Sequence, residues 1–521
     1  MNRNMLPFVG AVVAIAAVTG VAALAGPGGT AETTVQRGGR LPVERSALLC
    51  PASTPPGAGN TTYVSFAPGS ADTRARLRSG TAELLPLVSG VGGNGRAGES
   101  KGKDDKKNGK NSEEGKARDT AKPVVPLLRT GKPATATTDQ ADAPALAGIA
   151  DGALAPGWSV QQTTAVPAGK GRGLLGVACA APDTDFWFPG VSTARERQDY
   201  VHLTNPDAAP AVVDLRLHGP DGPLPSSSGE GVIVPPHSSV PVLLSTLTGS
   251  AMADAALHVT AREGRVGAAV QAADAGRGGD WLPAAVVPAR GVVLPGIPAD
   301  AASVHLVAVA AGGADADVEV RLATPSGTIA PAGLESLHVK SGMTTVVDLG
   351  SVTKSEPGSL VLRPADGSRG LITAALRVTR GKGSKQEVAF IPATRPVGAR
   401  ATAADNRSRG GTLSLVAPGP GKAVTVKVTA SAGSGGGTSV AKTYTVEGGS
   451  TLAVDPPVPS GLKGSYALTV EPEAGGGPLY AARTLTLPHG GVPAFTIQAL
   501  PDDRGTIAVP AARQDLSLLT D

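Results

Sequence analysis

The chain has 521 residues, of which 70 are glycine and 45 are proline, while aromatic residues make up only 3%. One hydrophobic core rarely organises so many residues, so we expect several domains whose cores are built from Ala, Val and Leu. The 47 basic and 43 acidic residues nearly cancel, and no Lys- and Arg-rich cluster lies beside aromatic residues, which argues against nucleic-acid binding.

The first predicted element is a hydrophobic helix at the N-terminus. One positive charge, Arg3, precedes the 21 uncharged residues 5–25. Ala-Leu-Ala ending at Ala25, followed by Gly26, fits the small-x-small rule of secretory signal peptides and predicts cleavage between these two residues. The same segment is long enough to remain as a transmembrane anchor, since about 20 apolar residues span a bilayer. Both alternatives place the rest of the chain outside the cytoplasmic membrane, in contact with it only through residues 1–25.

Two segments are expected to lack regular structure. Residues 26–44 are rich in Gly, Thr and Arg and are predicted to be a flexible spacer. Residues 90–122 are predicted to be a disordered insertion, because residues 96–119 hold eight basic and six acidic side chains and no large apolar one. A solvated loop is the favoured interpretation of this insertion, and an arm that contacts an anionic envelope polymer is the alternative.

The only two cysteines are Cys50 and Cys179. In an exported protein such a pair is predicted to form one structural disulfide, here closing a loop of about 130 residues. A redox or metal-binding role is the alternative, but the sequence has no Cys-x-x-Cys motif.

From residue 123 onward, apolar and polar residues alternate in short runs, for example over 212–217, 318–322 and 424–428. This period of two is typical of half-buried antiparallel strands, and turn residues between the runs favour β-sandwiches. Residues 143–154 are the best candidate for a helix. We therefore predict an all-β protein of about four tandem Ig-like antiparallel β-sandwich modules forming an elongated scaffold. The predicted modules are 45–190, 191–298, 299–395 and 396–521.

Large aromatic residues recur at the predicted end of each module. Trp187, Trp281, Phe390 and Phe495 are separated by 94, 109 and 105 residues. We expect each to fill the centre of its own sandwich, and a platform that stacks on sugars is the alternative. His202 and His305 occupy matching places in two repeats, and we expect them on the exposed polar side of an opening strand, with a metal-binding pair as the alternative.

The sequence offers no recognisable catalytic, cofactor-binding or metal-binding constellation. None of the seven histidines has a metal-ligand spacing. Two Ser-x-x-Lys strings, 351–354 and 460–463, have the spacing of a serine nucleophile and its lysine, but both lie in Gly- and Pro-rich turns without the other motifs of such enzymes. We therefore predict a protein that is not an enzyme and needs no cofactor.

Several segments of the chain form a recognisable combination. They are the leader 1–25, Leu41-Pro-Val-Glu-Arg-Ser-Ala-Leu-Leu-Cys-Pro, and Phe186-Trp-Phe-Pro-Gly through Asn205-Pro-Asp to Arg216-Leu-His-Gly-Pro-Asp-Gly. Together they resemble a family of uncharacterised exported proteins from high-GC actinobacteria. The resemblance covers nearly the whole chain apart from the charged insertion, and it implies an exported envelope protein. The function of that family is not established, so it implies no catalytic residues.

Two functions are compatible with these features. The first is a non-enzymatic, secreted or membrane-anchored cell-envelope protein with a scaffold or binding role, whose unidentified partner is an envelope polymer or an envelope protein. The alternative is an extracytoplasmic enzyme or accessory factor of envelope polysaccharide metabolism with a site at a module junction. Such a site needs polar residues that converge from distant positions.

Overall fold

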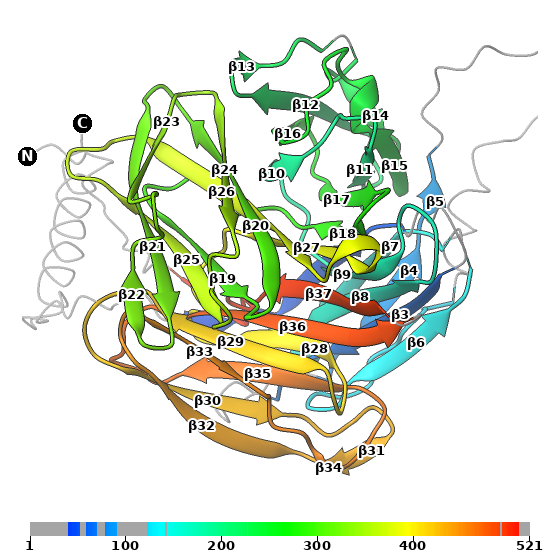
Figure 1. The fold of residues 1–521 in the computed structure, drawn as a ribbon. Helices are drawn as coiled ribbons and strands as arrows, with labels where there is room; N and C mark the ends of the chain where they lie inside the picture. The colour runs from blue at the N-terminus through cyan, green and yellow to red at the C-terminus, as the bar shows by residue number, and fades with distance from the viewer. Residues whose placement is uncertain are drawn as a thin grey trace, which may run out of the picture. The chain divides into compact units, whose positions relative to one another are not determined.

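The computed structural model describes residues 40–52, 59–69, 79–90, 122–140, 143–226, 228–489 and 492–509. Regular structure in this part of the chain consists of β-strands and three short 3-10 turns, which confirms the all-β prediction (Figure 1). Residues 42–507 form one compact unit. The predicted leader 1–25, with Ala25 and Gly26, lies outside the described residues, as do most of the spacer and nearly all of the insertion 90–122.

Eight of the sheets form four pairs with a shared strand order. In the first pair, one sheet has the order β2-β7-β4 and the other β6-β3-β8-β9. The helix expected over 143–154 is wrong, because this segment holds strand β7 and the 3-10 turn η1 (Gly152–Leu154). The strands of the first pair are β2 (Arg45–Cys50), β3 (Asn60–Phe66), β4 (Ala82–Pro86), β6 (Ala134–Thr138), β7 (Leu146–Asp151), β8 (Ser159–Val166) and β9 (Gly173–Ala178).

The second pair has the orders β10-β16-β12-β13, with β14 also on β12, and β18-β17-β11-β15-β5. β5 (Val88–Ser89) comes from the first part of the chain and runs parallel to β15. The other strands are β10 (Asp185–Val191), β11 (Arg197–Thr204), β12 (Ala211–Gly219), β13 (Gly222–Pro223), β14 (Val232–Val234), β15 (Ser238–Leu243), β16 (Ala255–Glu263), β17 (Gly267–Asp274) and β18 (Gly278–Leu282), with the turn η2 (Leu244–Thr246).

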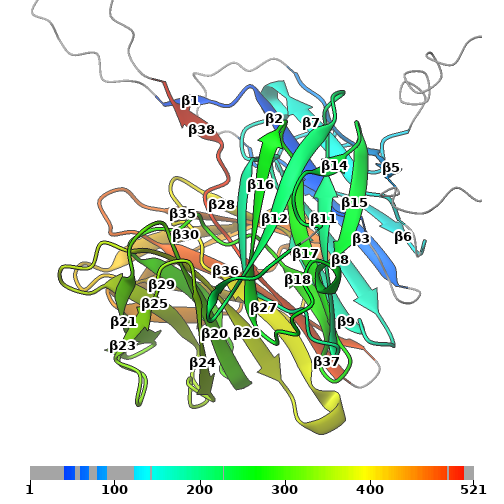
Figure 2. The ribbon, with the colours of Figure 1, turned by 90° about the horizontal axis from the view of Figure 1, so that it is seen from above.

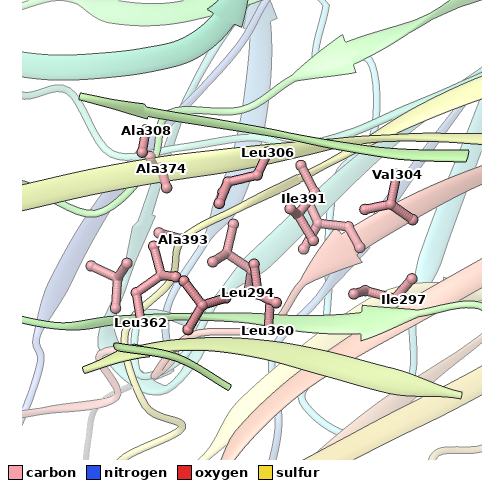
Figure 3. Close-up of a cluster of buried hydrophobic side chains, with 14 of the residues drawn as sticks. Leu294, Ile297, Val304, Leu306, Ala308, Leu360, Leu362, Ala374, Ile391 and Ala393 are labelled. Carbon is pink, nitrogen blue, oxygen red and sulfur yellow. The ribbon is translucent and has the colours of Figure 1, made fainter. Parts of the chain in front are cut away.

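The third pair repeats this arrangement as β19-β25-β21-β22, with β23 also on β21, and β24-β20-β26-β27. Its elements are β19 (Val292–Ile297), β20 (Ala301–Ala311), β21 (Ala316–Thr324), β22 (Gly327–Ile329), β23 (Ser336–Val339), β24 (Thr344–Gly350), β25 (Gly358–Pro364), β26 (Leu371–Arg380), η3 (Gly383–Lys385) and β27 (Glu387–Pro392). Figure 3 shows its core, where Leu294, Leu360 and Leu362 from one sheet face Leu306 and Ala374 from the other.

The fourth pair has the orders β28-β35-β30-β32 and β33-β29-β36-β37. Its strands are β28 (Ala401–Asn406), β29 (Gly411–Ala417), β30 (Val424–Ala430), β32 (Val440–Val446), β33 (Ser450–Val454), β35 (Tyr466–Pro472), β36 (Tyr480–His489) and β37 (Val492–Ala499). Two further sheets have two strands each, β31 (Gly436–Thr438) with β34 (Ser460–Lys463), and β1 (Arg40–Pro42) with β38 (Thr506–Ala508).

The strand pairing sets where each pair begins. β10 spans the expected boundary at 190/191 and pairs with β16, and β19 lies before the expected boundary at 298/299 and pairs with β25. Both strands therefore open the following pair. The sequence misplaced them because the last strand of one pair and the opening strand of the next are separated by only a few residues. That each pair is a separate Ig-like module stays a prediction.

The four sheet pairs form a closed ring within residues 42–507. The last strands of the pairs, β9, β18, β27 and β37, contact one another in cyclic order, and the fourth contacts the first (Figures 1 and 2). The opening strands β10, β19 and β28 pack on β26, β36 and β8 of the next pair. In the first pair, Leu49 of β2 packs on Gly267 of β17, where an added Cβ would lie 2.9 Å from the leucine Cδ1. The elongated arrangement expected from the repeat is therefore wrong.

The recurrent aromatic residues join neighbouring pairs. Trp281 of β18 packs against Val166, Leu175 and Val177 of the first pair. Phe390 of β27 belongs to the core cluster of the second pair, and Phe495 of β37 to that of the third. The expectation that each fills its own sandwich is therefore wrong for these three residues.

Trp187 differs from the other three aromatic residues because it lies in an opening strand, β10. It contacts Val309 and Ala311 of the third pair and stacks on His258, with ring centroids 3.9 Å apart. The side chains of Trp187, Trp281, Phe390 and Phe495 are all buried. They therefore offer no open ring face to a sugar.

Candidate functional site

The strands nearest the ring centre bury both of their faces. In β8, Gln161, Gln162 and Thr163 are as buried as the apolar residues of the cores. Neighbouring residues of a strand point to opposite faces, and Gln161 and Thr163 share the outer face of β8, which in a sandwich standing alone would meet water. In the ring a neighbouring pair covers them, and Thr163 Oγ1 donates a hydrogen bond of 2.9 Å to Asp405 Oδ2 of β28. The ring centre is consequently a polar interior, in which charged and uncharged polar groups connect different sheet pairs.

Asp280 of β18 occupies the middle of this interior. Its Oδ1 accepts hydrogen bonds from Gly176 N of β9 at 2.9 Å, Thr496 Oγ1 of β37 at 3.2 Å and Trp281 N at 2.8 Å. Burial raises the pKa of the Asp280 carboxyl well above its usual range, and the nearby Glu387 carboxylate adds to this effect. A single carboxyl group therefore connects three of the four last strands.

The tight fit at Gly176 gives a direct test of this junction. A Cβ at residue 176 would lie 2.6 Å from Thr496 Cγ2, so the Gly176→Ala variant forces the two strands apart. We expect a loss of about 1–3 kcal/mol in the free energy of unfolding, measured by urea denaturation. The same substitution in a Thr496→Ala background should cost less, because the obstructing methyl group is gone. Equal costs in both backgrounds would show that the two residues are not in contact.

Glu387 of β27 is a further acidic group of the interior. Burial raises the pKa of its carboxyl to about 7, although the Arg172 guanidinium opposes the rise, with Nε 3.5 Å from Glu387 Oε1. The arginine reaches over from the segment before β9 and also donates a hydrogen bond of 2.9 Å to Gln386 O. The first and third pairs are thus connected through a carboxyl group that prefers to be neutral.

This carboxyl group makes stability depend on pH. The folded-state pKa of about 7 exceeds the unfolded value of 4.5, so stability from Glu387 is full below pH 4.5 and is lost as the pH rises through 7. We expect Glu387→Gln to match the parent protein near pH 4.5 and to exceed its free energy of unfolding by about 1–3 kcal/mol at pH 8. Denaturation curves at the two pH values measure this. The exposed Glu473→Gln is the control, and a difference between parent and Glu387→Gln that does not change with pH would contradict the expectation.

A cavity of about 300 Å³ opens where the last strands end. All four sheet pairs line it, which no single repeat could achieve alone. Its walls are mainly apolar, and representative residues are Leu48, Trp158, Phe186, Pro283, Pro392 and Ile497. We call it the axial cavity. Ligand sites in proteins are commonly concave, mostly apolar and about 300–1,000 Å³ in volume.

The acidic residues that line the axial cavity already have structural partners. Asp503 Oδ2 accepts hydrogen bonds from Arg400 Nε at 2.5 Å and Thr402 Oγ1 at 3.1 Å. Its Oδ1 accepts one from Gly505 N at 3.0 Å. Asp502 accepts from Ala399 N at 2.8 Å and from the backbone N–H of Arg504 at 2.7 Å. Burial raises the pKa of Asp503, against the effect of the arginine. Both carboxylates therefore hold the loop after β37 in place.

His202 also lines the axial cavity and is buried, so its expected exposed position is wrong. Its ring packs edge-on against Trp281, with centroids 5.2 Å apart, and burial lowers its pKa to about 4. The neighbouring sheet pair covers the outer face of β11, which the sequence pattern suggested would meet water. His305 is half-buried, with Nε2 3.7 Å from Asp348 Oδ1.

The predicted disulfide between Cys50 and Cys179 is confirmed, with an S–S distance of 1.99 Å. It joins the end of β2 to the residue after β9, and Cys179 lines the axial cavity. Neither Ser-x-x-Lys string is helical, since 351–354 form a turn and 460–463 form β34. Within the described ranges, no group of three or more His, Cys, Asp or Glu side chains is placed to hold a metal ion. That part of the chain also contains no helix long and apolar enough to cross a membrane.

A model of a family of unknown function, DUF5719, matches residues 134–457, which include strands from all four sheet pairs. No curated protein and no solved structure matches the chain.

Proposed function

The chain belongs to the DUF5719 family of unknown function, and we propose that it is an exported, non-enzymatic binding protein of the cell envelope that holds a small ligand in the axial cavity. One observation carries this proposal. Residues from all four sheet pairs, which lie far apart in the sequence, converge on one mainly apolar cavity where the last strands end. A closed ring offers a ligand fixed walls, which lowers the entropy cost of binding.

The export part of the proposal draws on the cysteine pair and the N-terminal sequence. A disulfide between Cys50 and Cys179 is compatible with an oxidising, extracytoplasmic compartment. Fractionation of the native host followed by N-terminal sequencing tests this part. A mature chain that begins at Gly26 indicates a released protein, and an intact Met1 indicates an anchored one. A cytosolic protein with both thiols reduced would contradict export.

The binding part is tested on the full chain purified without denaturant from its own host. Native mass spectrometry should detect an added mass that denaturation releases as a small molecule. The Ala284→Phe variant is the matched comparison, because Ala284 is half-buried, lines the axial cavity and lies after β18. It should carry much less of the ligand while keeping the far-UV circular dichroism of the parent. A parent protein without bound mass, and without a thermal shift in a panel of small molecules, would refute the proposal.

Enzymatic action at the junction of the sheet pairs is the competing interpretation. It requires a carboxylate or histidine that is available to a substrate. Asp503 is ion-paired with Arg400, Asp502 accepts backbone hydrogen bonds, and burial lowers the pKa of His202 to about 4, which makes it a weak base. These observations favour a binding site over a catalytic one.

A further inference from the structure

Polar groups in the axial cavity wall form hydrogen bonds with other protein groups, which leaves apolar surface for a ligand. The indole Nε1 of Trp158 donates a hydrogen bond of 2.9 Å to Ser65 Oγ inside the first sheet pair. Leu48, Pro283 and Ala499 are only half-buried and therefore keep apolar surface that water reaches. A water molecule takes up about 30 Å³ of liquid and a methylene group is of similar size. A cavity of about 300 Å³ therefore accommodates an apolar group of about ten carbon atoms.

One exposed cation stands among these lining residues. Arg504 has φ 54°, a left-handed conformation that an arginine rarely adopts. Asp502 holds Arg504 in this conformation by accepting a hydrogen bond of 2.7 Å from the backbone N–H of Arg504. The residue before Arg504, Asp503, donates a hydrogen bond of 2.8 Å from its own backbone N–H to Arg400 O. Residues held in such conformations by their surroundings often mark ligand-binding positions.

The two arginines of this region differ in how their charge is balanced. Arg400 forms an ion pair with Asp503, with Nε 2.5 Å from Oδ2. The guanidinium of Arg504 has no ion pair with any acidic residue in the described part of the chain, and its side chain is exposed. A guanidinium without an acidic partner among the described residues, beside an apolar cavity, matches a ligand with an anionic head group and an apolar tail.

We propose that the axial cavity binds an anionic amphiphile, a carboxylate on an unbranched apolar chain of about ten carbons, with the chain in the cavity and the carboxylate on Arg504. This proposal rests on the proposed function and adds the chemical class of the ligand. The walls supply affinity through burial of the chain, and the guanidinium selects a negative head group over a neutral or positive one.

The test uses the delipidated full chain and three probes of equal chain length: decanoate, decanol and decylamine. Isothermal titration calorimetry should show that decanoate binds at least about tenfold more tightly than decanol, as expected for a charge-assisted hydrogen bond, and that decylamine binds more weakly still. Added salt should weaken decanoate binding and leave decanol binding unchanged. Equal affinity for all three probes would overturn the assignment of an anionic ligand.

Two variants locate the binding site. Arg504→Gln should reduce decanoate affinity to that of decanol, and as a surface change it should leave the fold intact. Arg369→Gln removes an exposed arginine on a hairpin of the third pair and should change nothing. Ala284→Phe should weaken both decanoate and decanol, because both place their chains in the cavity.

The outcomes separate this inference from the proposed function. If decanoate and decanol bind alike, Arg504→Gln has no effect and Ala284→Phe still blocks both, the cavity binds ligands but the anionic class is wrong. If decanoate binds but neither variant affects it, the site lies elsewhere and the inference fails. If no probe binds and the native protein carries no added mass, both proposals fail together.

Discussion

Replacing Trp281 by Ala should lower the free energy of unfolding by about 3–5 kcal/mol, a cost usual for removing a fully buried tryptophan from a core. Trp281 is 1% exposed and packs between the first and second sheet pairs, against Leu175 and Val177 of β9 and Ala269 of β17. Denaturation in urea, read by circular dichroism, measures the change. Because this residue joins two pairs, the damage should spread across the ring.

Hydrogen exchange measured strand by strand distinguishes a residue that joins two sheet pairs from a residue that lies inside one sandwich. Hydrogen exchange in the Trp281→Ala variant should increase in β9 of the first pair as well as in β18. Trp281→Phe keeps a ring at the position and should recover much of the lost stability. Exchange that increases only within the second pair, or a stability loss below about 1 kcal/mol, would contradict the role in joining the pairs.

Removing the disulfide should have an effect of similar size. Cys50 and Cys179 are 129 residues apart, and the chain-entropy model gives a loop of that size up to about 5 kcal/mol of stabilisation. We expect the double variant Cys50→Ala, Cys179→Ala to lose about 3–5 kcal/mol in urea denaturation. A reductant should lower the stability of the parent protein by a similar amount and leave the double variant unchanged. Identical denaturation curves for parent and variant would show that the first pair holds together without the covalent link.

Alternation along single strands predicted much of the fold. Val318, Val320 and Leu322 are buried in β21, and Glu319 and Arg321 on the other side form an ion pair, with Arg321 Nη2 3.0 Å from Glu319 Oε2. A strand of this kind packs one face in the core of its own sheet pair and exposes the other to solvent, so the sequence of one repeat is enough to predict it. The repeated order of such strands in the sequence also indicated the number of sheet pairs.

Alternation could not reveal which outer faces another sheet pair covers. His202 and Gln161 both lie on the outer faces of their strands, and both are buried by the ring. One signal was present in the sequence. On the outer face of β8, Gln161 and Thr163 are polar but uncharged, whereas the solvated face of β21 carries charges. Uncharged polar residues on the outer face are compatible with burial, because their hydrogen bonds can be satisfied within the protein at lower desolvation cost.

The candidate site was also beyond the reach of sequence reasoning. Leu48, Pro283, Pro392 and Ile497 come from four different pairs and share no motif, so only ring closure brings them together. Arg504 gave no signal either, because a left-handed arginine cannot be distinguished in sequence from any other residue of a polar loop. The residues that ring closure brings together there are mainly apolar.

Ring closure also governs the order in which this chain can fold. Strands β3 and β8, near the start, pack on β28, which begins at residue 401. The polar face of β8 therefore stays without its cover until more than three quarters of the chain is available. Contacts between such distant segments carry a large loop-closure cost and slow the folding of β proteins. An open repeat array tolerates the loss of a terminal repeat, since each repeat contacts only its neighbours. This ring has no terminal repeat, so deletion of any one pair would expose the buried faces of two others.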